Sequence, residues 1–147
     1  FLKNLSNIFN LKVIVGLHPS NKEGFKYLSN FVISKKRTID LIPNCEIAVF
    51  THSSLISNAA MFKKKILSIK SKYLGNYLSN LTSKYQKSLG LYCLDVDKEL
   101  ILNKNNCLKK MNRSIKNYNK YIKTKLKVDG DNLPYKKITN TIKKEFF

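Results

Sequence analysis

The stretch EIAVFTHSSLISNAAMFKKKILSI, residues 46–69, decides the fold class of this 147-residue chain. EIAVF (46–50) is a run of aliphatic and aromatic residues that predicts a buried strand. THSS (51–54) supplies hydroxyl side chains at which a helix can begin, and LISNAAMF (55–62) predicts that helix. KKILSI (64–69) predicts the next strand. A strand, a short helix and a second strand in this order form the unit from which parallel sheets are built.

The segments on either side of this stretch continue the alternation of helix and strand. We expect, in chain order, a helix over 1–9, strands over 11–17 and 31–34, a short helix around 39–42, one or two short helices within 73–90, a strand over 91–96 and Lys-rich helices over 97–126. The near-continuous apolar run LKVIVGL (11–17) is typical of a strand covered on both faces. The pattern predicts an α/β fold, a Rossmann-like parallel sheet with helices on both faces.

The length of the chain fits a single domain with one core. Residues 1–127 carry the α/β pattern, and 128–147 predict a turn around Gly130 followed by a helix from Pro134. We expect this last helix to pack on the domain or on a missing N-terminal domain. The first residue is Phe1, so the chain is expected to be processed or to belong to something longer.

Apolar and cysteine patterns exclude several classes of protein. No apolar run reaches the roughly 18–20 residues that a membrane-spanning helix needs, and the amphipathic start FLKNLSNIF is not a signal peptide. Cys45, Cys93 and Cys107 are an odd number without a CxxC pair, which argues against a disulfide framework and a zinc site. We expect Cys45 and Cys93 to be small core residues. We expect the protein to lie in a reducing cytoplasm.

The formal net charge of +19 suggests a polyanionic partner. Its distribution weakens that interpretation, because Lys is spread along the whole chain together with Asn, and Arg37 and Arg113 are the only arginines. Proteins that recognise nucleic acid usually rely on arginine, whose guanidinium group forms bidentate hydrogen bonds. We therefore favour a coding bias with a solvated surface and expect no nucleic-acid partner. The Lys-rich segment 104–127 remains a candidate for contact with an anionic membrane face or an anionic acceptor.

Two polar clusters fall at the carboxyl ends of predicted strands, where open parallel sheets bind their ligands. The first is Gly16-Leu17-His18-Pro19-Ser20, in which Pro19 withholds an N–H group and ends the strand. The second is Thr51-His52-Ser53-Ser54, directly before a helix whose free N–H groups could bind phosphate. Each cluster has a simpler interpretation as a turn or a helix cap. Their occurrence at the same edge of one sheet favours a common site.

These two motifs resemble a known family. GLHPS (16–20) and IAVFTHSSLISNAAMFKKKILSI (47–69) are similar to the nucleotide-binding C-terminal half of GT-B glycosyltransferases, most of all to the His-Pro and Ser-Ser motifs of bacterial sialyltransferases and polysialyltransferases. The resemblance covers roughly residues 11–95. It implies a GT-B donor-binding domain that binds a CMP-linked sugar, sialic acid or a similar acidic sugar, and serves bacterial surface polysaccharide synthesis together with a glycan acceptor.

The resemblance also implies roles for individual residues. His18 would stabilise the nucleotide leaving group as the catalytic residue, and His18 and Pro19 would meet the phosphate and the pyrimidine nucleoside. Ser53 and Ser54 would hold phosphate oxygens. Gly16, Ser20 and Thr51 complete the expected nucleotide-binding set. No metal ion or other cofactor is expected, because the reaction would be a direct displacement from the nucleotide-sugar.

The chain departs from the family pattern in lacking the acidic catalytic base, which belongs to the N-terminal half of such enzymes. VDGD (128–131) is superficially similar to the acidic motif, but its composition is typical of a turn. The isolated chain is therefore expected to bind nucleotide weakly and to turn over nothing. The expected location is the cytoplasm, with a possible peripheral position on the inner face of the membrane.

Two other functions stay open. Within the enzymes, a UDP-sugar 2-epimerase or a polyol-phosphate transferase of the CDP-glycerol type would place similar polar loops at the same strand ends. From another class, a non-catalytic basic module for RNA or DNA would exploit the positive charge, with Tyr118 and Tyr121 among lysines as stacking platforms. The sequence holds no P-loop, GxGxxG, HExxH or GxSxG motif that would favour other chemistry.

Overall fold

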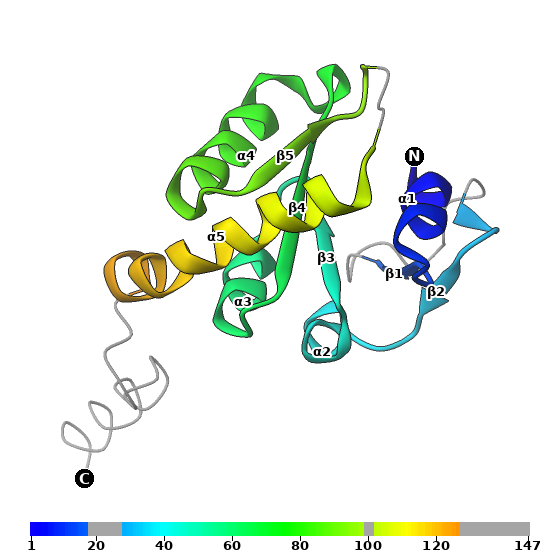
Figure 1. The fold of residues 1–147 in the computed structure, drawn as a ribbon, viewed down its shortest axis with the longest axis horizontal. Helices are drawn as coiled ribbons and strands as arrows, with labels where there is room; N and C mark the ends of the chain where they lie inside the picture. Colours follow the sequence, from blue (N-terminus) through cyan, green and yellow to red (C-terminus); the bar gives the residue numbers. More distant parts are fainter. Residues whose placement is uncertain (18–27, 99–101, 127–147) are drawn as a thin grey trace, which may run out of the picture.

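The computed structural model describes residues 1–17, 28–98 and 102–126. These residues form an α/β fold whose strands are all parallel and lie in two sheets (Figure 1). The larger sheet has the order β3-β4-β5, and β1 and β2 pair separately. The strands are β1 (Ile14–Gly16), β2 (Val32–Ser34), β3 (Ile47–Phe50), β4 (Lys65–Lys70) and β5 (Tyr92–Asp95). The helices are α1 (Leu2–Phe9), α2 (Thr38–Leu41), α3 (Leu55–Met61), α4 (Gly75–Leu89) and α5 (Lys104–Lys125), with 3₁₀ turns η2 (Ile42–Asn44) and η3 (Lys72–Leu74).

Strand β4 is the centre of the larger sheet and is covered on both faces. Successive side chains of a strand point to opposite faces. Ile66 is 0% exposed and Leu67 is 1% exposed, so neither face of β4 meets solvent. This confirms the prediction of a Rossmann-like parallel sheet with helices on both of its faces.

Each face of the larger sheet has its own apolar core. On one face, α3, α4 and the second half of α5 bury a cluster that includes Ile56, Ile66 and Tyr118. On the other face, α1 and the first half of α5 bury a cluster that includes Leu67 and Met111. Helix α5 therefore contributes to both cores, and it passes from one to the other beside the turn between α4 and β5.

A hydrogen bond fixes α5 at this crossing. The hydroxyl of Ser114, which is 1% exposed, donates to the carbonyl of Gly90 at 2.6 Å. Gly90 adopts the left-handed conformation that ends α4, with φ of 61°. The end of α4, the start of β5 and the middle of α5 are thus held together at one point.

Two expectations about LKVIVGL are wrong. Only residues Ile14–Gly16 join a ladder, and Ile14 is 53% exposed, so this strand is not covered on both faces. Strand β1 also shares no ladder with β3 in the described residues, so the expectation of one continuous sheet is wrong. The physical reason lies in α1, because Ser6 accepts from the Leu11 amide at 3.1 Å and its hydroxyl donates to the Leu11 carbonyl at 2.7 Å. These bonds withdraw the start of the run from pairing.

The other elements follow the expected order with small differences. The segment 73–90 forms one long helix after the turn η3, and the Lys-rich segment forms the single helix α5. Asn10 ends α1 in the left-handed conformation, with φ of 54°. The expected turn and last helix of 128–147 lie outside the described residues.

Candidate functional site

The loop between β3 and α3 lies at the carboxyl end of β3, as predicted. Its backbone is tied to α4, because the Thr82 hydroxyl donates to the Thr51 carbonyl at 2.9 Å. The Thr51 hydroxyl forms a hydrogen bond with Nδ1 of His52 at 3.1 Å. Thr51 and His52 are half-buried. The loop is therefore a fixed structure that presents the two serines that follow it.

Ser53 and Ser54 differ in what their hydroxyls do. The Ser53 hydroxyl accepts from the Leu55 amide at 3.2 Å, and the Ser53 carbonyl accepts from the Ile56 amide at 3.1 Å. Ser53 thus accepts hydrogen bonds from the first turn of α3, whose N-cap is Ser54, as the interpretation of this motif as a helix cap expected. The proton of the Ser53 hydroxyl stays available for donation. The Ser54 side chain is exposed and makes no capping hydrogen bond. Within the described ranges neither hydroxyl donates a hydrogen bond, so both can donate to an anion at this point.

Gly16 has a packing role that the sequence pattern did not reveal. A Cβ atom at this position would lie 2.6 Å from the Thr38 hydroxyl oxygen, so any other residue would collide with α2. The Thr38 hydroxyl donates to the Leu17 carbonyl at 3.3 Å. The absence of a side chain at Gly16 thus lets α2 approach the end of β1. This role depends on the contact between Gly16 and Thr38, which are 22 positions apart, so no local sequence pattern could predict it.

Of the first predicted cluster only Gly16 and Leu17 are described, so the common site of the two clusters stays a prediction. Among the described residues, no hydrogen bond joins Gly16 or Leu17 to the Thr51–Ser54 loop. The separate pairing of β1 and β3 explains this, because the two strand ends belong to different sheets. His18, Pro19 and Ser20 lie outside the described residues.

A charged cavity lies at the carboxyl ends of β4 and β5, on the same edge as the Thr51–Ser54 loop. Its volume is about 440 Å³, and it is lined by Lys70, Ser71, Lys72, Ser79, Asp95, Asp97 and Lys98. Lys70 and Asp95 form an ion pair at 3.5 Å. Asp97 accepts hydrogen bonds from the Ser71 hydroxyl at 3.0 Å and from the Lys72 amide. Sequence reasoning passed over these residues, although SIKSK (68–72) and LDVDK (94–98) place charges directly after two strands.

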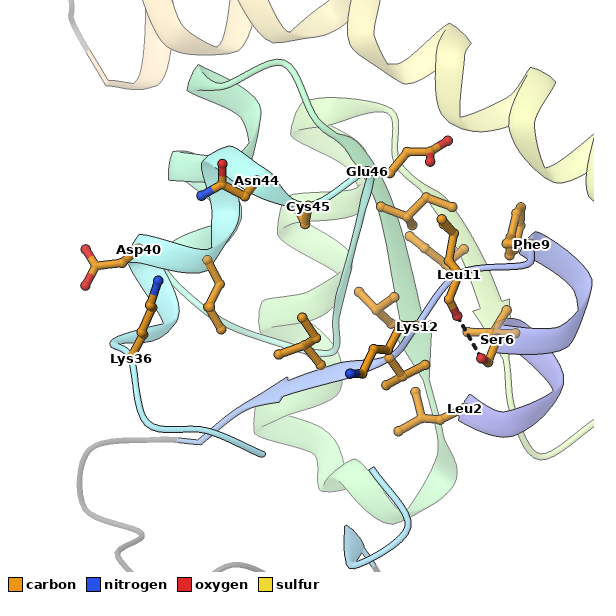
Figure 2. Close-up of a pocket in the computed structure, with 17 residues that line it drawn as sticks. Leu2, Ser6, Phe9, Leu11, Lys12, Lys36, Asp40, Asn44, Cys45 and Glu46 are labelled. Atoms are coloured by element: carbon orange, nitrogen blue, oxygen red, sulfur yellow. Dashed lines mark hydrogen bonds between the residues drawn. The ribbon is translucent and has the colours of Figure 1, made fainter. Parts of the chain in front are cut away.

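A larger and mainly apolar cavity lies between α1, β1, the α2–η2 segment and β3 (Figure 2). Its volume is about 610 Å³, within the range of small-molecule sites of about 300–1,000 Å³. Its walls carry ten aliphatic or aromatic side chains: Leu2, Leu5, Phe9, Leu11, Val13, Ile14, Leu41, Ile47, Val49 and Leu67. The sequence pattern did not predict it, because its walls come from segments that are far apart in the chain.

The cysteines do not resemble activated nucleophiles. Burial raises the pKa of Cys45 and of Cys93 above the ordinary thiol value, which keeps both thiols protonated near neutral pH. The Cys93 sulfur accepts from Nε2 of Gln86 at 2.8 Å, next to Ser68 on β4. These contacts fit the expected role of small core residues.

In the described parts of the chain, no group of three or more His, Cys, Asp or Glu side chains is arranged to bind a metal ion. None of the helices in the same parts combines the length and the apolar character needed to cross a bilayer. Comparison of the chain with protein-family models, with curated proteins and with solved structures gives no match in any of the three.

Proposed function

We propose that this chain is the donor-binding domain of a GT-B glycosyltransferase that transfers a sugar from a nucleotide donor during bacterial surface polysaccharide synthesis. The donor we propose is CMP-sialic acid or a similar acidic sugar. The proposal rests on the motif resemblance of GLHPS and of the 47–69 stretch. The structural observation that carries it is the edge of the β3-β4-β5 sheet, where polar side chains follow all three parallel strands.

This edge suits an anionic nucleotide for a physical reason. In open parallel α/β sheets, ligands bind outside the carboxyl ends of the strands. Ser53 and Ser54 supply hydroxyl donors after β3, and Lys70 and Lys72 supply positive charge after β4. Helix α3 has only seven residues, so these side chains, more than its dipole, would hold a phosphate.

The proposed chemistry is a direct displacement at the sugar without a metal ion. His18 would donate to the departing phosphate, a fixed donor at the atom where negative charge develops. The acidic residue that activates the acceptor would come from another part of the enzyme. The exposed basic side chains of α5, which contains no acidic residue, would face an anionic membrane surface or acceptor chain.

Calorimetric titration with CMP, UMP, CDP and UDP tests this proposal. One pyrimidine nucleotide should bind selectively, and the S53A/S54A variant should lose about tenfold or more in affinity, since a hydrogen bond to a charged group contributes about 1.5–3 kcal/mol. His18→Ala should also weaken binding. Ser88→Ala, an exposed serine on α4, is the matched control and should bind like the wild type.

A well-folded wild-type chain that binds none of the four nucleotides would contradict the proposal. The basic α5 then favours the second candidate, a module that binds RNA or DNA without catalysis. That candidate requires an affinity for oligonucleotides that falls steeply as salt rises and that does not change in His18→Ala. Product analysis with CMP-, UDP- and CDP-linked donors on the whole enzyme would separate the transferase from an epimerase or a polyol-phosphate transferase.

A further inference from the structure

The apolar cavity between α1, β1 and β3 is separate from the proposed nucleotide site. Neither Gly16 nor the Thr51–Ser54 loop lines it. It opens where the larger sheet has no neighbour, because β3 pairs only with β4 in the described residues. Ile14 contributes to its wall and is 53% exposed, so apolar surface faces the opening. The walls therefore form an apolar surface that a hydrocarbon chain could contact.

The charged side chains that line this cavity differ in whether they already have a partner. Asp40 accepts two hydrogen bonds from the Arg37 guanidinium, both 2.9 Å long, and Arg37 lowers the pKa of Asp40. Glu46 pairs with Lys65 at 3.3 Å. Figure 2 shows the carboxylates of Asp40 and Glu46 directed away from the space between the lining side chains. Both acidic groups are thus occupied elsewhere.

Lys12 is the cation that remains. Lys12 is exposed and lines the cavity, and Figure 2 shows its ammonium group beside apolar side chains of the cavity wall. In the described part of the chain, this ammonium has no ion-pair or hydrogen-bond partner. Lys36 also lines the cavity and adds positive charge beside the Arg37–Asp40 pair. The cavity therefore combines an apolar interior with an unmatched positive charge.

We propose that this cavity binds a long-chain carboxylate, with the apolar chain against Ile14, Ile47 and Val49 and the carboxylate paired with Lys12. The apolar walls suit a hydrocarbon chain, since removing such a chain from water is favourable. The single positive charge of Lys12 matches the single negative charge of a carboxylate head. This proposal does not depend on the proposed nucleotide function.

Calorimetric titration with laurate below its micelle concentration tests the proposal at low salt. We expect one laurate per chain, and weaker binding of dodecyl maltoside, which has the same chain and no charge. Lys12→Met should weaken laurate binding about two- to fivefold, the effect of losing one exposed ion pair. Ile14→Gln should weaken it about fivefold, because part of an apolar wall is lost.

Two matched control variants show whether a loss of laurate binding comes from a change in surface charge or in folding. Lys3→Met removes an exposed lysine of α1 that does not line the cavity, and Val32→Gln changes the exposed β2 residue paired with Ile14. Both should bind laurate like the wild type. Several laurates per chain, with equal affinity in all four variants, would overturn the proposal in favour of general adsorption to a basic surface. Equal binding of dodecyl maltoside, or no binding of laurate to the folded chain, would overturn it as well.

Discussion

Tyr118 lies in the core between α3, α4 and α5 with its side chain 0% exposed. Its hydroxyl is buried and has no hydrogen-bond partner among the described residues, which is uncommon because a buried polar group loses its hydrogen bonds to water. Burial raises the pKa of Tyr118 above the ordinary tyrosine value. Burial also raises the pKa of Tyr92, on β5, to about 12.

These shifts predict a loss of stability at alkaline pH. Below pH about 10, tyrosine is protonated in the folded and the unfolded chain, and its contribution to stability is constant. As the pH rises from about 10 towards 12, the unfolded chain releases these protons while the folded chain retains them. The free energy of unfolding must then fall with rising pH.

Tyr118→Phe removes one of the groups responsible, which also include Tyr85, because burial raises the pKa of that tyrosine as well. We expect the variant to lose less stability between pH 9 and 11.5 than the wild type, and to gain about 1 kcal/mol at pH 7 because an unpartnered hydroxyl is removed. Urea unfolding at each pH measures both effects. Tyr73→Phe, at a residue 83% exposed, is the control. An identical pH dependence for Tyr118→Phe and the wild type would show that Tyr118 ionises freely.

At the same scale, the residues of the candidate site were only partly predictable. Ser53 and Ser54 could be placed at the start of α3 because hydroxyl residues before an apolar helical segment are a local signal. The role of Gly16 could not be predicted, since it depends on Thr38 in α2. Lys12 looked like any other lysine, because its position in a cavity arises only when α1, β1 and β3 are packed.

Among the elements, α5 connects the two cores. Its first half buries Met111 against the face of the sheet that α1 covers, and its second half buries Tyr118 against the opposite face. The two cores should therefore lose their structure together. A rigid helix shared by both cannot leave one of them while it stays packed in the other.

Met111→Ala tests this coupling. The side chain is 0% exposed, and its truncation should lower the free energy of unfolding by about 2–5 kcal/mol. Met61→Ala, at a residue 37% exposed on α3, should change it by less than about 0.5 kcal/mol. Far-ultraviolet circular dichroism and tyrosine fluorescence should report one common transition in both variants. Separate transitions in Met111→Ala would mean that the cores unfold independently.

The elements themselves could be predicted where the sequence pattern is local. β3, α3 and β4 appear within one or two residues of their expected bounds, because each carries its own apolar pattern and begins or ends at a clear signal. The pairing of β1 was mispredicted, since hydrogen bonds from Ser6 in α1 hold Leu11. Whether two strands pair depends on such competing contacts, and the apolar pattern of one strand does not contain them.

For the whole molecule, the formal charge of +19 is the dominant electrostatic fact. Three ion pairs are formed among the described residues, and most of the lysines there belong to none of them. Like charges oppose the compact state, and salt screens them. The temperature of unfolding should therefore rise as salt increases.

Lys116→Glu is the variant that isolates this effect. Lys116 lies three and four positions from Arg113 and Lys120 on α5, so the substitution replaces two repulsive pairs with two attractive ones. We expect a gain of about 1 kcal/mol in the free energy of unfolding at low salt. The gain should shrink towards zero near 1 M salt, which is its internal control. If the gain in the free energy of unfolding does not depend on salt, its cause is helix propensity and not charge repulsion.

The position of α5 in the chain has a consequence for synthesis on the ribosome. Both cores need side chains of this helix, and α5 follows every strand of the two sheets. The nascent chain can form its first helix and individual turns early, but neither face of the sheet can be sealed until residues 104–125 have left the exit tunnel. Until then, the apolar surfaces of β3 and β4 stay open to chaperones, and a pause in translation before α5 would prolong that exposure.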